Sequence, residues 1–180
     1  ADQPPEDNER AALRLGTLFT RMRALPRPVV AVVHGRALAG GAGLATACDL
    51  VLACESARLG YPEIQRGFVP AMVMTMLRRL TGEKRAFDLV ATGRVLGARE
   101  AWEIGLVSRV IPDPEFEATV AETLRALAAT SASALGLTKR LFYELDGPSF
   151  ADGIALGARI NALARAHPDF RSAIAAFLDR

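Results

Sequence analysis

The sequence holds few of the residues on which metal-binding and disulfide-bonded proteins depend. Only two cysteines and two histidines occur among the 180 residues, and they show no spacing typical of a zinc site. We expect Cys48 and Cys54 to be small residues of a buried helix and a buried strand rather than a disulfide pair, as in a protein of the reducing cytosol. The sequence predicts no metal site.

Charge and aromatic residues are too sparse for a nucleic-acid-binding protein. The formal net charge is +2 and aromatic residues make up 6% of the chain, whereas such proteins need a basic patch. The longest uncharged apolar stretch, Ala37–Cys48, has twelve residues, and a membrane-spanning helix needs about 20. The first residues are acidic and polar, unlike a signal peptide. We therefore expect a cytoplasmic protein whose partners include neither nucleic acid nor membrane.

Three common motifs are missing from the sequence. It has no G-x-G-x-x-G with a following acidic residue, no Gly-Lys-Ser/Thr of a P-loop and no G-x-S-x-G nucleophile elbow. These absences argue against a Rossmann dinucleotide site, a P-loop and a serine hydrolase of that type.

What the chain does have is a large apolar fraction, 51% of its residues, which suits one domain with a sizeable core. Near-continuous apolar runs at Val29–Val33 and Leu50–Ala53 predict strands of a sheet covered on both faces. Because these strands alternate with helical patterns, the sequence predicts α/β architecture. From Val69 onward helices dominate, apart from a strand at Leu106–Ile111.

Helical periodicity places most of the remaining elements. We expect residues 1–10, which are charged and contain prolines, to be a mobile lead-in, followed by a helix that ends before Pro26. Asp113 is predicted to cap a helix whose first position is Pro114. Further helices are predicted over Met72–Leu80, Ala86–Ala91, Ala98–Ile104, Ala132–Leu145, Ser149–Ala166 and Asp169–Leu178.

The most informative segment is Pro28–Gly67. After its first strand come a turn at His34–Gly35 and a glycine-rich loop, Ala39–Gly43, which leads into a short helix. A helix start leaves backbone N–H groups without acceptors, and with the positive end of the helix dipole they can hold a developing oxyanion. Glu63 follows Gly43 by twenty residues. An oxyanion donor and a lone carboxylate are the parts needed for proton transfer next to a carbonyl.

Three ordered blocks resemble the crotonase family, also called the enoyl-CoA hydratase/isomerase family. The blocks are PVVAVVHGRALAGGAGLATACDLVLA, LGYPEIQRGFVP and TGRVLGAREAWEIGLVSRVIP, and a helical tail ending HPDFRSAIAAFLDR also fits. The resemblance runs from about Arg23 to Arg180. It implies an α/β, crotonase-like (ClpP/crotonase) spiral core of ββα units, partial here and covering residues 1–111, and a C-terminal helical oligomerisation region covering residues 112–180.

A complete member of this family carries further N-terminal βα units, which supply one of its two oxyanion N–H donors. The sequence lacks those units, and Ala1-Asp2 matches the end of the loop that carries the missing donor. We therefore expect a fragment, or a chain from which a segment was removed, that does not build a full active site alone.

The resemblance also implies roles for single residues. Gly40 matches the glycine whose N–H binds the oxyanion, with a plain helix-start turn as the alternative. Glu63 matches one of two glutamates that act as acid and base, with a surface glutamate capping a short helix as the alternative. The implied substrate contacts are Ala39, Gly41, Gly43, Tyr61 and Pro70.

The sequence departs from the family at Gly43, where the second glutamate would fall. Hydration needs a water activated on one side and a proton delivered to Cα, so the loss of one of two such groups costs about 10²–10⁴ in rate. A double-bond isomerase needs a single base that takes a proton and returns it. In the segment Ala71–Met74, residues that include two methionines replace the glycines usual in hydratases. This replacement indicates either a reshaped apolar acyl pocket or core packing.

The sequence thus favours an acyl-CoA thioester enzyme that isomerises a double bond. A hydratase and a non-catalytic acyl-CoA-binding relative or assembly subunit are the alternatives. Coenzyme A belongs to the substrate, so we expect no separate cofactor. Apolar positions along Ser149–Leu178 need a partner face, and the resemblance implies a homotrimer or homohexamer.

Overall fold

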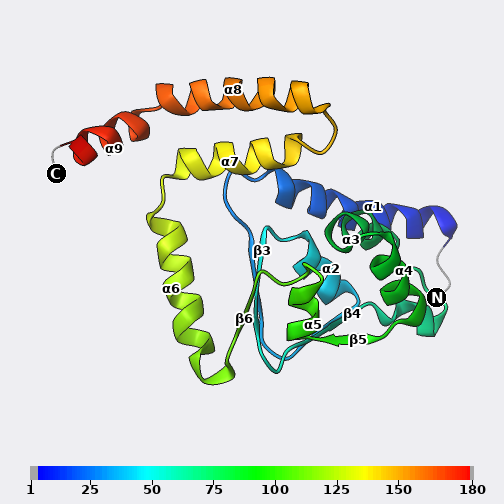
Figure 1. Cartoon of the computed structure of the whole chain (residues 1–180). Helices are drawn as coiled ribbons and strands as arrows, with labels where there is room; N and C mark the ends of the chain where they lie inside the picture. The colour runs from blue at the N-terminus through cyan, green and yellow to red at the C-terminus, as the bar shows by residue number, and fades with distance from the viewer. Residues whose placement is uncertain (1–3, 179–180) are drawn as a thin grey trace. The chain divides into compact units, whose positions relative to one another are not determined.

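The computed structural model of the protein describes residues 4–178 (Figure 1). The chain forms two compact units: the first holds residues up to Arg23 together with Val29–Glu122, and the second holds Ala24–Pro28 and the residues from Thr123 onward. Their boundary lies within helix α6 (Phe116–Ala129). The division after residue 111 that was drawn from the sequence separates the strand-containing part from the last helices.

The first unit contains a parallel sheet with strand order β1-β3-β6. Its strands are β1 (Val30–Val33), β3 (Leu50–Cys54) and β6 (Arg109–Ile111). Val30 pairs with Leu50, and the register continues to Val33 opposite Ala53. The two apolar runs of the sequence therefore lie side by side. β3 is buried as predicted, but the prediction of two covered faces was wrong for β1, which is an edge strand with Val32 43% exposed.

A second sheet, with order β2-β4-β5, was not predicted from the sequence. Its strands are β2 (Arg36–Leu38), β4 (Arg58–Gly60) and β5 (Val95–Gly97), the first pair parallel and the second antiparallel. Three residues are too few to show the alternation that identifies a strand in a sequence. These strands form because their partners are brought beside them by the rest of the fold.

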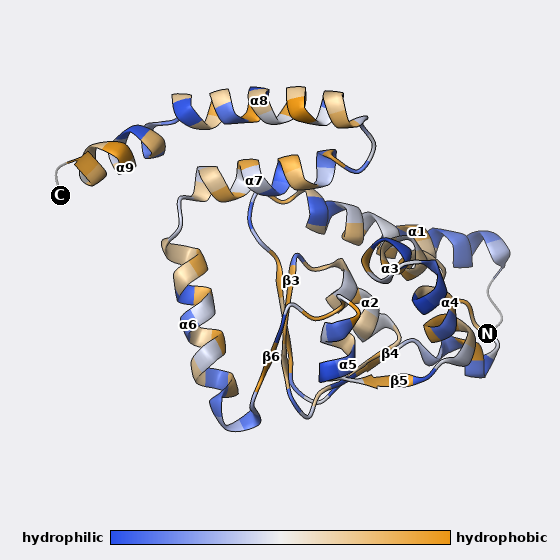
Figure 2. Cartoon of the chain, in the orientation of Figure 1, coloured by the Kyte–Doolittle hydropathy of each residue, from blue (hydrophilic) through white to orange (hydrophobic). Residues whose placement is uncertain are grey.

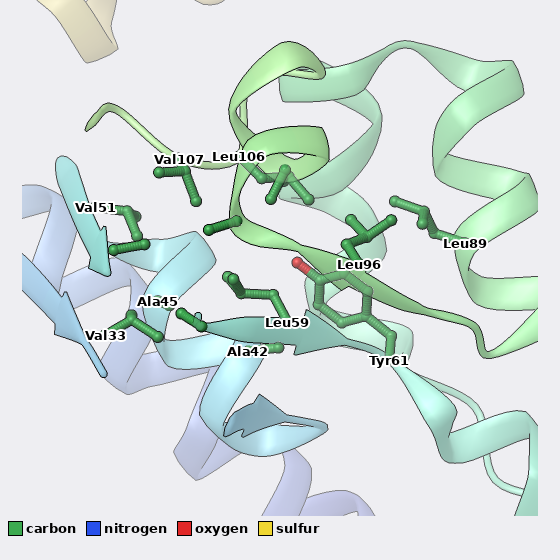
Figure 3. Close-up of a cluster of buried hydrophobic side chains, with 14 of the residues drawn as sticks. Val33, Ala42, Ala45, Val51, Leu59, Tyr61, Leu89, Leu96, Leu106 and Val107 are labelled. Carbon is green, nitrogen blue, oxygen red and sulfur yellow. The ribbon is translucent and has the colours of Figure 1, made fainter. Parts of the chain in front are cut away.

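Helices surround the two sheets of the first unit. They are α1 (Pro5–Ala24), α2 (Gly40–Ala47), α3 (Ala71–Thr81), α4 (Glu83–Thr92) and α5 (Ala98–Glu103). Fully buried side chains that include Leu59, Tyr61 and Leu96 form the core between these elements, and Figure 3 shows them gathered with Leu89. A smaller cluster of Phe19 with Met22 and Ala47 lies under α1.

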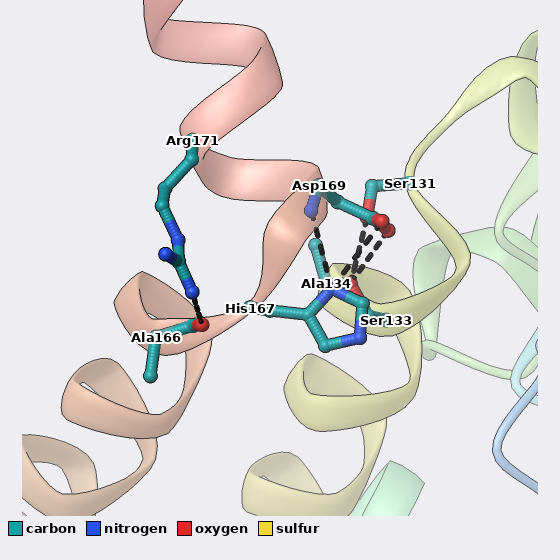
Figure 4. A network of polar contacts seen from close by, with 7 residues as sticks. All are labelled: Ser131, Ser133, Ala134, Ala166, His167, Asp169 and Arg171. Carbon is teal, nitrogen blue, oxygen red and sulfur yellow. Dashed lines mark hydrogen bonds and ion pairs between the residues drawn. The ribbon is translucent and has the colours of Figure 1, made fainter.

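The second unit is helical throughout its described residues from Ala132 onward, apart from short connections. It contains α7 (Ala132–Glu144), α8 (Phe150–Ala166) and α9 (Pro168–Leu178). The Asp169 carboxylate accepts hydrogen bonds from the hydroxyls of Ser131, at 2.6 Å, and Ser133, at 2.8 Å (Figure 4). These bonds join the start of α9 to the start of α7.

Several local predictions were wrong, and each has a physical reason. Helix α1 begins at Pro5, within the expected lead-in, because the Pro4 carbonyl accepts the N–H groups of Asp7 and Asn8. The predicted glycine loop is the first turn of α2. Asp113 caps no helix; its carboxylate accepts the Ser56 N–H at 3.1 Å and holds that turn instead.

The strand predicted from Leu106 is also shorter than expected. Leu106 and Val107 both donate their N–H groups to the Ala101 carbonyl, so they continue the turn after α5, and β6 starts only at Arg109. Neither cysteine forms a disulfide; Cys54 is buried in β3 and Cys48 is half-buried. None of the described helices is long and apolar enough to span a membrane.

Candidate active site

Glu63 lies in a short 3-10 helix, η1 (Pro62–Arg66), that follows β4. Pro62 fits the first position of a helix because it has no N–H to lose. The turn ends at Gly67, whose left-handed backbone (φ 67°) suits glycine, and whose N–H donates to the Ile64 carbonyl at 3.0 Å. Gln65 Nε2 donates to the Gly93 carbonyl at 3.2 Å and ties the turn to the end of α4.

The start of α2 is held by backbone bonds alone. The Ala39 N–H donates to the Gly60 carbonyl at 2.9 Å, and the Ala39 carbonyl accepts the Gly43 N–H at 2.8 Å. Ala39 has φ 50° and ψ −121°, a conformation that alanine rarely adopts, and no side chain caps the helix. The N–H groups of the first turn, from Gly40 to Ala42, therefore have no acceptor within the helix.

These two elements meet at one cavity of about 640 Å³. Its lining includes Gly40 at the start of α2 and Glu63 from η1. Of the residues implied as substrate contacts, those that also line it are Ala39, Gly43 and Pro70. The cavity size falls in the range of small-molecule sites.

One carboxylate oxygen of Glu63 is the most unusual atom in this cavity. Oε2 is buried, and no donor in the described part of the chain forms a hydrogen bond with it. A buried polar atom without a partner is costly, and in native proteins it calls for an explanation such as a catalytic role. An oxygen in this position remains free to accept a proton from a molecule bound in the cavity.

Two of the implied contacts lie elsewhere. Gly41 lines a separate surface depression beside β1, together with Leu44 and Cys48. Tyr61 is fully buried in the core, and its hydroxyl lies 2.6 Å from Oγ1 of Thr46 in α2. Tyr61 therefore does not line the cavity. Its hydroxyl instead contacts α2, the helix that begins at the cavity.

The environment of Tyr61 also limits its chemistry. Burial raises the pKa of Tyr61 to about 12, and the nearby charge of Glu63 adds to this rise. The phenol is therefore neutral at physiological pH and serves as a hydrogen-bonding group. Glu63 is the only ionisable side chain among the described residues that line the cavity.

Sequence reasoning missed the contribution of α1. One stripe of this helix lines the cavity with Asn8, Ala11, Ala12, Leu15 and Phe19. The sequence predicted a helix here, but it held no signal that one face of this helix lines a cavity rather than packs in the core. The Ala1-Asp2 pair that matches the second donor loop lies outside the described residues.

The sequence model of enoyl-CoA hydratase/isomerase matches residues 2–180. The chain belongs to the enoyl-CoA hydratase/isomerase family. A Thermus thermophilus protein, provisionally named an enoyl-CoA hydratase, is 45% identical over 175 residues, which are 97% of this chain and 69% of the relative. The 2,3-dehydroadipyl-CoA hydratase of Escherichia coli is 33% identical over 164 residues, or 91% of this chain and 64% of the relative.

Solved structures of enoyl-CoA hydratase/isomerase proteins share the fold. The enoyl-CoA hydratase of Mycobacterium smegmatis superposes with a TM-score of 0.94 at 28% identity, over 99% of this chain and 70% of the neighbour. Human enoyl-CoA hydratase domain-containing protein 3 gives 0.93 at 26% identity, over 99% and 71%. The predicted crotonase-like α/β fold is confirmed. This chain covers 70% and 71% of the two neighbours, which accords with the further units expected in a complete family member.

Proposed function

We propose that the protein acts on an acyl-CoA thioester, with the Gly40 N–H binding the thioester oxyanion and Glu63 transferring protons. The observation that carries this proposal is the buried, unpartnered Oε2 of Glu63 in the same cavity as the start of α2. The N-terminus of a helix favours negative charge, and a preorganised N–H donor lowers the energy of a developing enolate. The carboxylate supplies the base next to it.

Isomerisation of a double bond fits this set of groups best. Glu63 removes a proton from C2 of a 3-enoyl thioester, and the electron pair moves into a dienolate whose oxygen accepts the Gly40 N–H. The protonated Glu63 then returns the proton at C4, which gives the 2-enoyl thioester and restores the carboxylate. A single acid/base group completes this cycle, and the cavity lining offers a single one.

Hydration is the second candidate function, because relatives of this chain are named as hydratases. It needs a group to activate water in addition to one that protonates Cα, and position 43 is a glycine. A third reading is a non-catalytic acyl-CoA-binding relative or assembly subunit. The same glycine favours this third reading, since it removes one of the two groups on which hydration depends.

The deciding experiment compares two substrates on the full chain. We expect the wild type to convert a 3-enoyl-CoA to the 2-enoyl isomer faster than it hydrates the 2-enoyl form. Glu63→Gln should abolish turnover because the amide cannot take and return the proton, while Glu103→Gln, on an exposed helix end, should leave it unchanged. Efficient hydration that survives Glu63→Gln would contradict the mechanism, and binding without any turnover would favour the non-catalytic reading.

Self-association of the tail is part of the proposal. Its helices α8 and α9 carry many hydrophobic residues (Figure 2). Large apolar side chains among them are exposed, including Phe150 at 87% and Phe177 at 72% of their surface. Such surface is unusual unless a partner covers it. A homotrimer or homohexamer is the proposed assembly, and light scattering that reports a monomer at micromolar concentration would contradict it.

A further inference from the structure

Helix α2, which begins with the proposed oxyanion donor, has few side chains that could hold it in place. Its eight residues are glycines, alanines, one leucine and one threonine, and Leu44 is 41% exposed. The side chains that it buries are small, as at Ala42 and Ala45. Small side chains interlock little with their neighbours, so packing alone leaves such a helix room to shift or rotate. Its position therefore depends on specific polar contacts.

The start of this helix also carries backbone strain. Ala39 has φ 50° and ψ −121°, which is a costly conformation for a residue other than glycine. Such a conformation persists only where the surrounding structure holds it. No side chain caps the helix, so the contacts that hold its first turn come from other elements.

The end of β4 supplies two contacts that hold α2. The Gly60 carbonyl accepts the Ala39 N–H at 2.9 Å, and the hydroxyl of the next residue, Tyr61, lies 2.6 Å from Thr46 Oγ1. The first contact fixes the start of the helix, and the second fixes a point about two turns further along. A helix held at one point can pivot about it, whereas a second, distant contact removes that freedom.

Strand β4 is itself a rigid reference for these contacts. It is the central strand of its sheet, with Gly60 opposite Leu38 of β2 and Val95 of β5. A Cβ atom at Gly60 would lie 3.0 Å from the Arg94 carbonyl oxygen, so the neighbouring chain leaves no room for a side chain. Glu63 lies in η1, which follows the same strand. The oxyanion donor and the base are thus both positioned from the end of β4.

We propose that Tyr61 is a positioning residue: through its hydrogen bond with Thr46 it holds the Gly40 N–H in the orientation that stabilises the enolate. The inference rests on the proposed function, which assigns the oxyanion to Gly40 and the proton to Glu63. Tyr61 does not line the cavity, so it acts on the reaction only through α2. It therefore affects the stabilisation of the enolate and leaves the binding of the thioester unchanged.

Turnover of a 3-enoyl-CoA by the full chain gives the first test. Tyr61→Phe removes the hydrogen bond but keeps the ring, and kcat should fall about tenfold because small displacements of a reacting group are costly. Calorimetry with butyryl-CoA, which has no double bond to move, should show nearly unchanged binding. Tyr143→Phe, in α7 and outside the cavity lining, is the matched control. Equal kcat in the wild type and Tyr61→Phe would overturn the inference.

A double variant separates positioning from stability. Thr46→Val leaves the Tyr61 hydroxyl buried without its partner, whereas Tyr61→Phe with Thr46→Val removes both groups, a change that is close to neutral for stability. The urea midpoint should therefore recover in the double variant while kcat stays as low as in Tyr61→Phe. Thr81→Val is the control, since it deletes a buried hydroxyl that donates to the Leu77 carbonyl within α3. Recovery of kcat together with stability would show a purely structural role and overturn the inference.

Binding of acetoacetyl-CoA tests the same point without turnover. Its C2 protons lie between two carbonyl groups, so it forms an enolate whose oxyanion resembles that of the proposed reaction. The ultraviolet absorption of the bound ligand reports the fraction in the enolate form. At one pH, the enolate-to-keto ratio should be about tenfold lower in Tyr61→Phe than in the wild type, and unchanged in Tyr143→Phe. An equal ratio in Tyr61→Phe and the wild type would contradict the positioning role.

The proposed function and this inference fail in different ways. Turnover of 3-enoyl-CoA with an undiminished kcat in Tyr61→Phe would leave the reaction standing and overturn the positioning role. Enolate formation that depends on Tyr61, without turnover of any enoyl-CoA, would support the positioning role and contradict the reaction. A wild type that neither turns over an enoyl-CoA nor forms the enolate would contradict both.

Discussion

The hydroxyl of Tyr61 lies 2.6 Å from Oγ1 of Thr46, and both groups are buried. Thr46 belongs to α2, which begins with the proposed oxyanion donor, and Tyr61 is separated from Glu63 by a single residue. Thr46 Oγ1 also donates to the Ala42 carbonyl at 2.7 Å. The tyrosine is therefore the donor in this pair, and its hydrogen bond connects the two elements that carry the candidate site.

This assignment of donor and acceptor predicts unequal costs for the two deletions. Tyr61→Phe removes one hydrogen bond but leaves Thr46 bonded to Ala42, so the free energy of unfolding should fall by about 0.5–1.5 kcal/mol. Thr46→Val leaves the tyrosine hydroxyl buried without an acceptor and should cost about 1–3 kcal/mol. Urea unfolding of both variants measures the difference. Equal costs, or a larger cost for Tyr61→Phe, would mean that the hydroxyl has another partner.

Alanine substitutions at the start of α2 should distinguish the roles of the adjacent residues Gly40 and Gly41. A Cβ atom at either Gly40 or Gly41 would meet nothing within 4 Å, so both variants should fold. Gly40 lines the cavity, and a methyl group there would keep a thioester carbonyl away from the backbone N–H. Steady-state kinetics should show kcat/KM reduced by about 10²-fold or more in Gly40→Ala and nearly unchanged in Gly41→Ala. Similar losses in both would place the donor elsewhere.

A carboxylate restored at position 43 should discriminate the two reactions. Gly43→Glu places Cβ at ordinary contact distance from Phe19, and the rest of the side chain has the cavity to enter. We expect no gain in isomerisation, since one base already completes that cycle, and a measurable gain in hydration of a 2-enoyl-CoA. Product analysis by chromatography checks both rates in one reaction. Faster isomerisation in this variant would show that Glu63 does not work alone.

Low pH should reduce the stability of the second unit, because the Asp169 carboxylate becomes protonated. Hydrogen bonds from Ser131 and Ser133 hold the pKa of this carboxyl below its ordinary value, with the nearby His167 acting in the same direction. A depressed pKa means that the stabilisation is present above about pH 4, the ordinary pKa of aspartate, and is lost as the pH falls through the folded-state pKa.

Asp169→Asn removes the charge and isolates this contribution. The wild type should unfold at higher urea concentration than the variant at pH 7, and the difference should shrink toward zero as the pH approaches 3. The side chain is 41% exposed, so the effect should be modest and should decrease with added salt. A difference that stays constant across this range would show that hydrogen bonding, rather than charge, holds the junction.

Much of this protein could be predicted from local signals. The apolar runs gave β1 and β3, and helical periodicity gave the long helices from α3 onward. These features are determined locally because a strand inside a covered sheet needs a run of apolar residues, and burial of one helix face imposes a repeat of 3.6 residues on the sequence. The three family blocks pointed to Gly40 and Glu63, which line one cavity.

Other features depend on the tertiary structure, because no periodic pattern in the sequence encodes them. The three-residue strands β2, β4 and β5 exist because a partner strand lies beside each of them. Tyr61 is buried in the core although it lies near Glu63 in the sequence. Phe19 lines the cavity although the sequence of its helix is that of an ordinary amphipathic helix. In each case the environment of the side chain comes from residues distant in the sequence, so only the folded chain determines whether it packs, supports or binds.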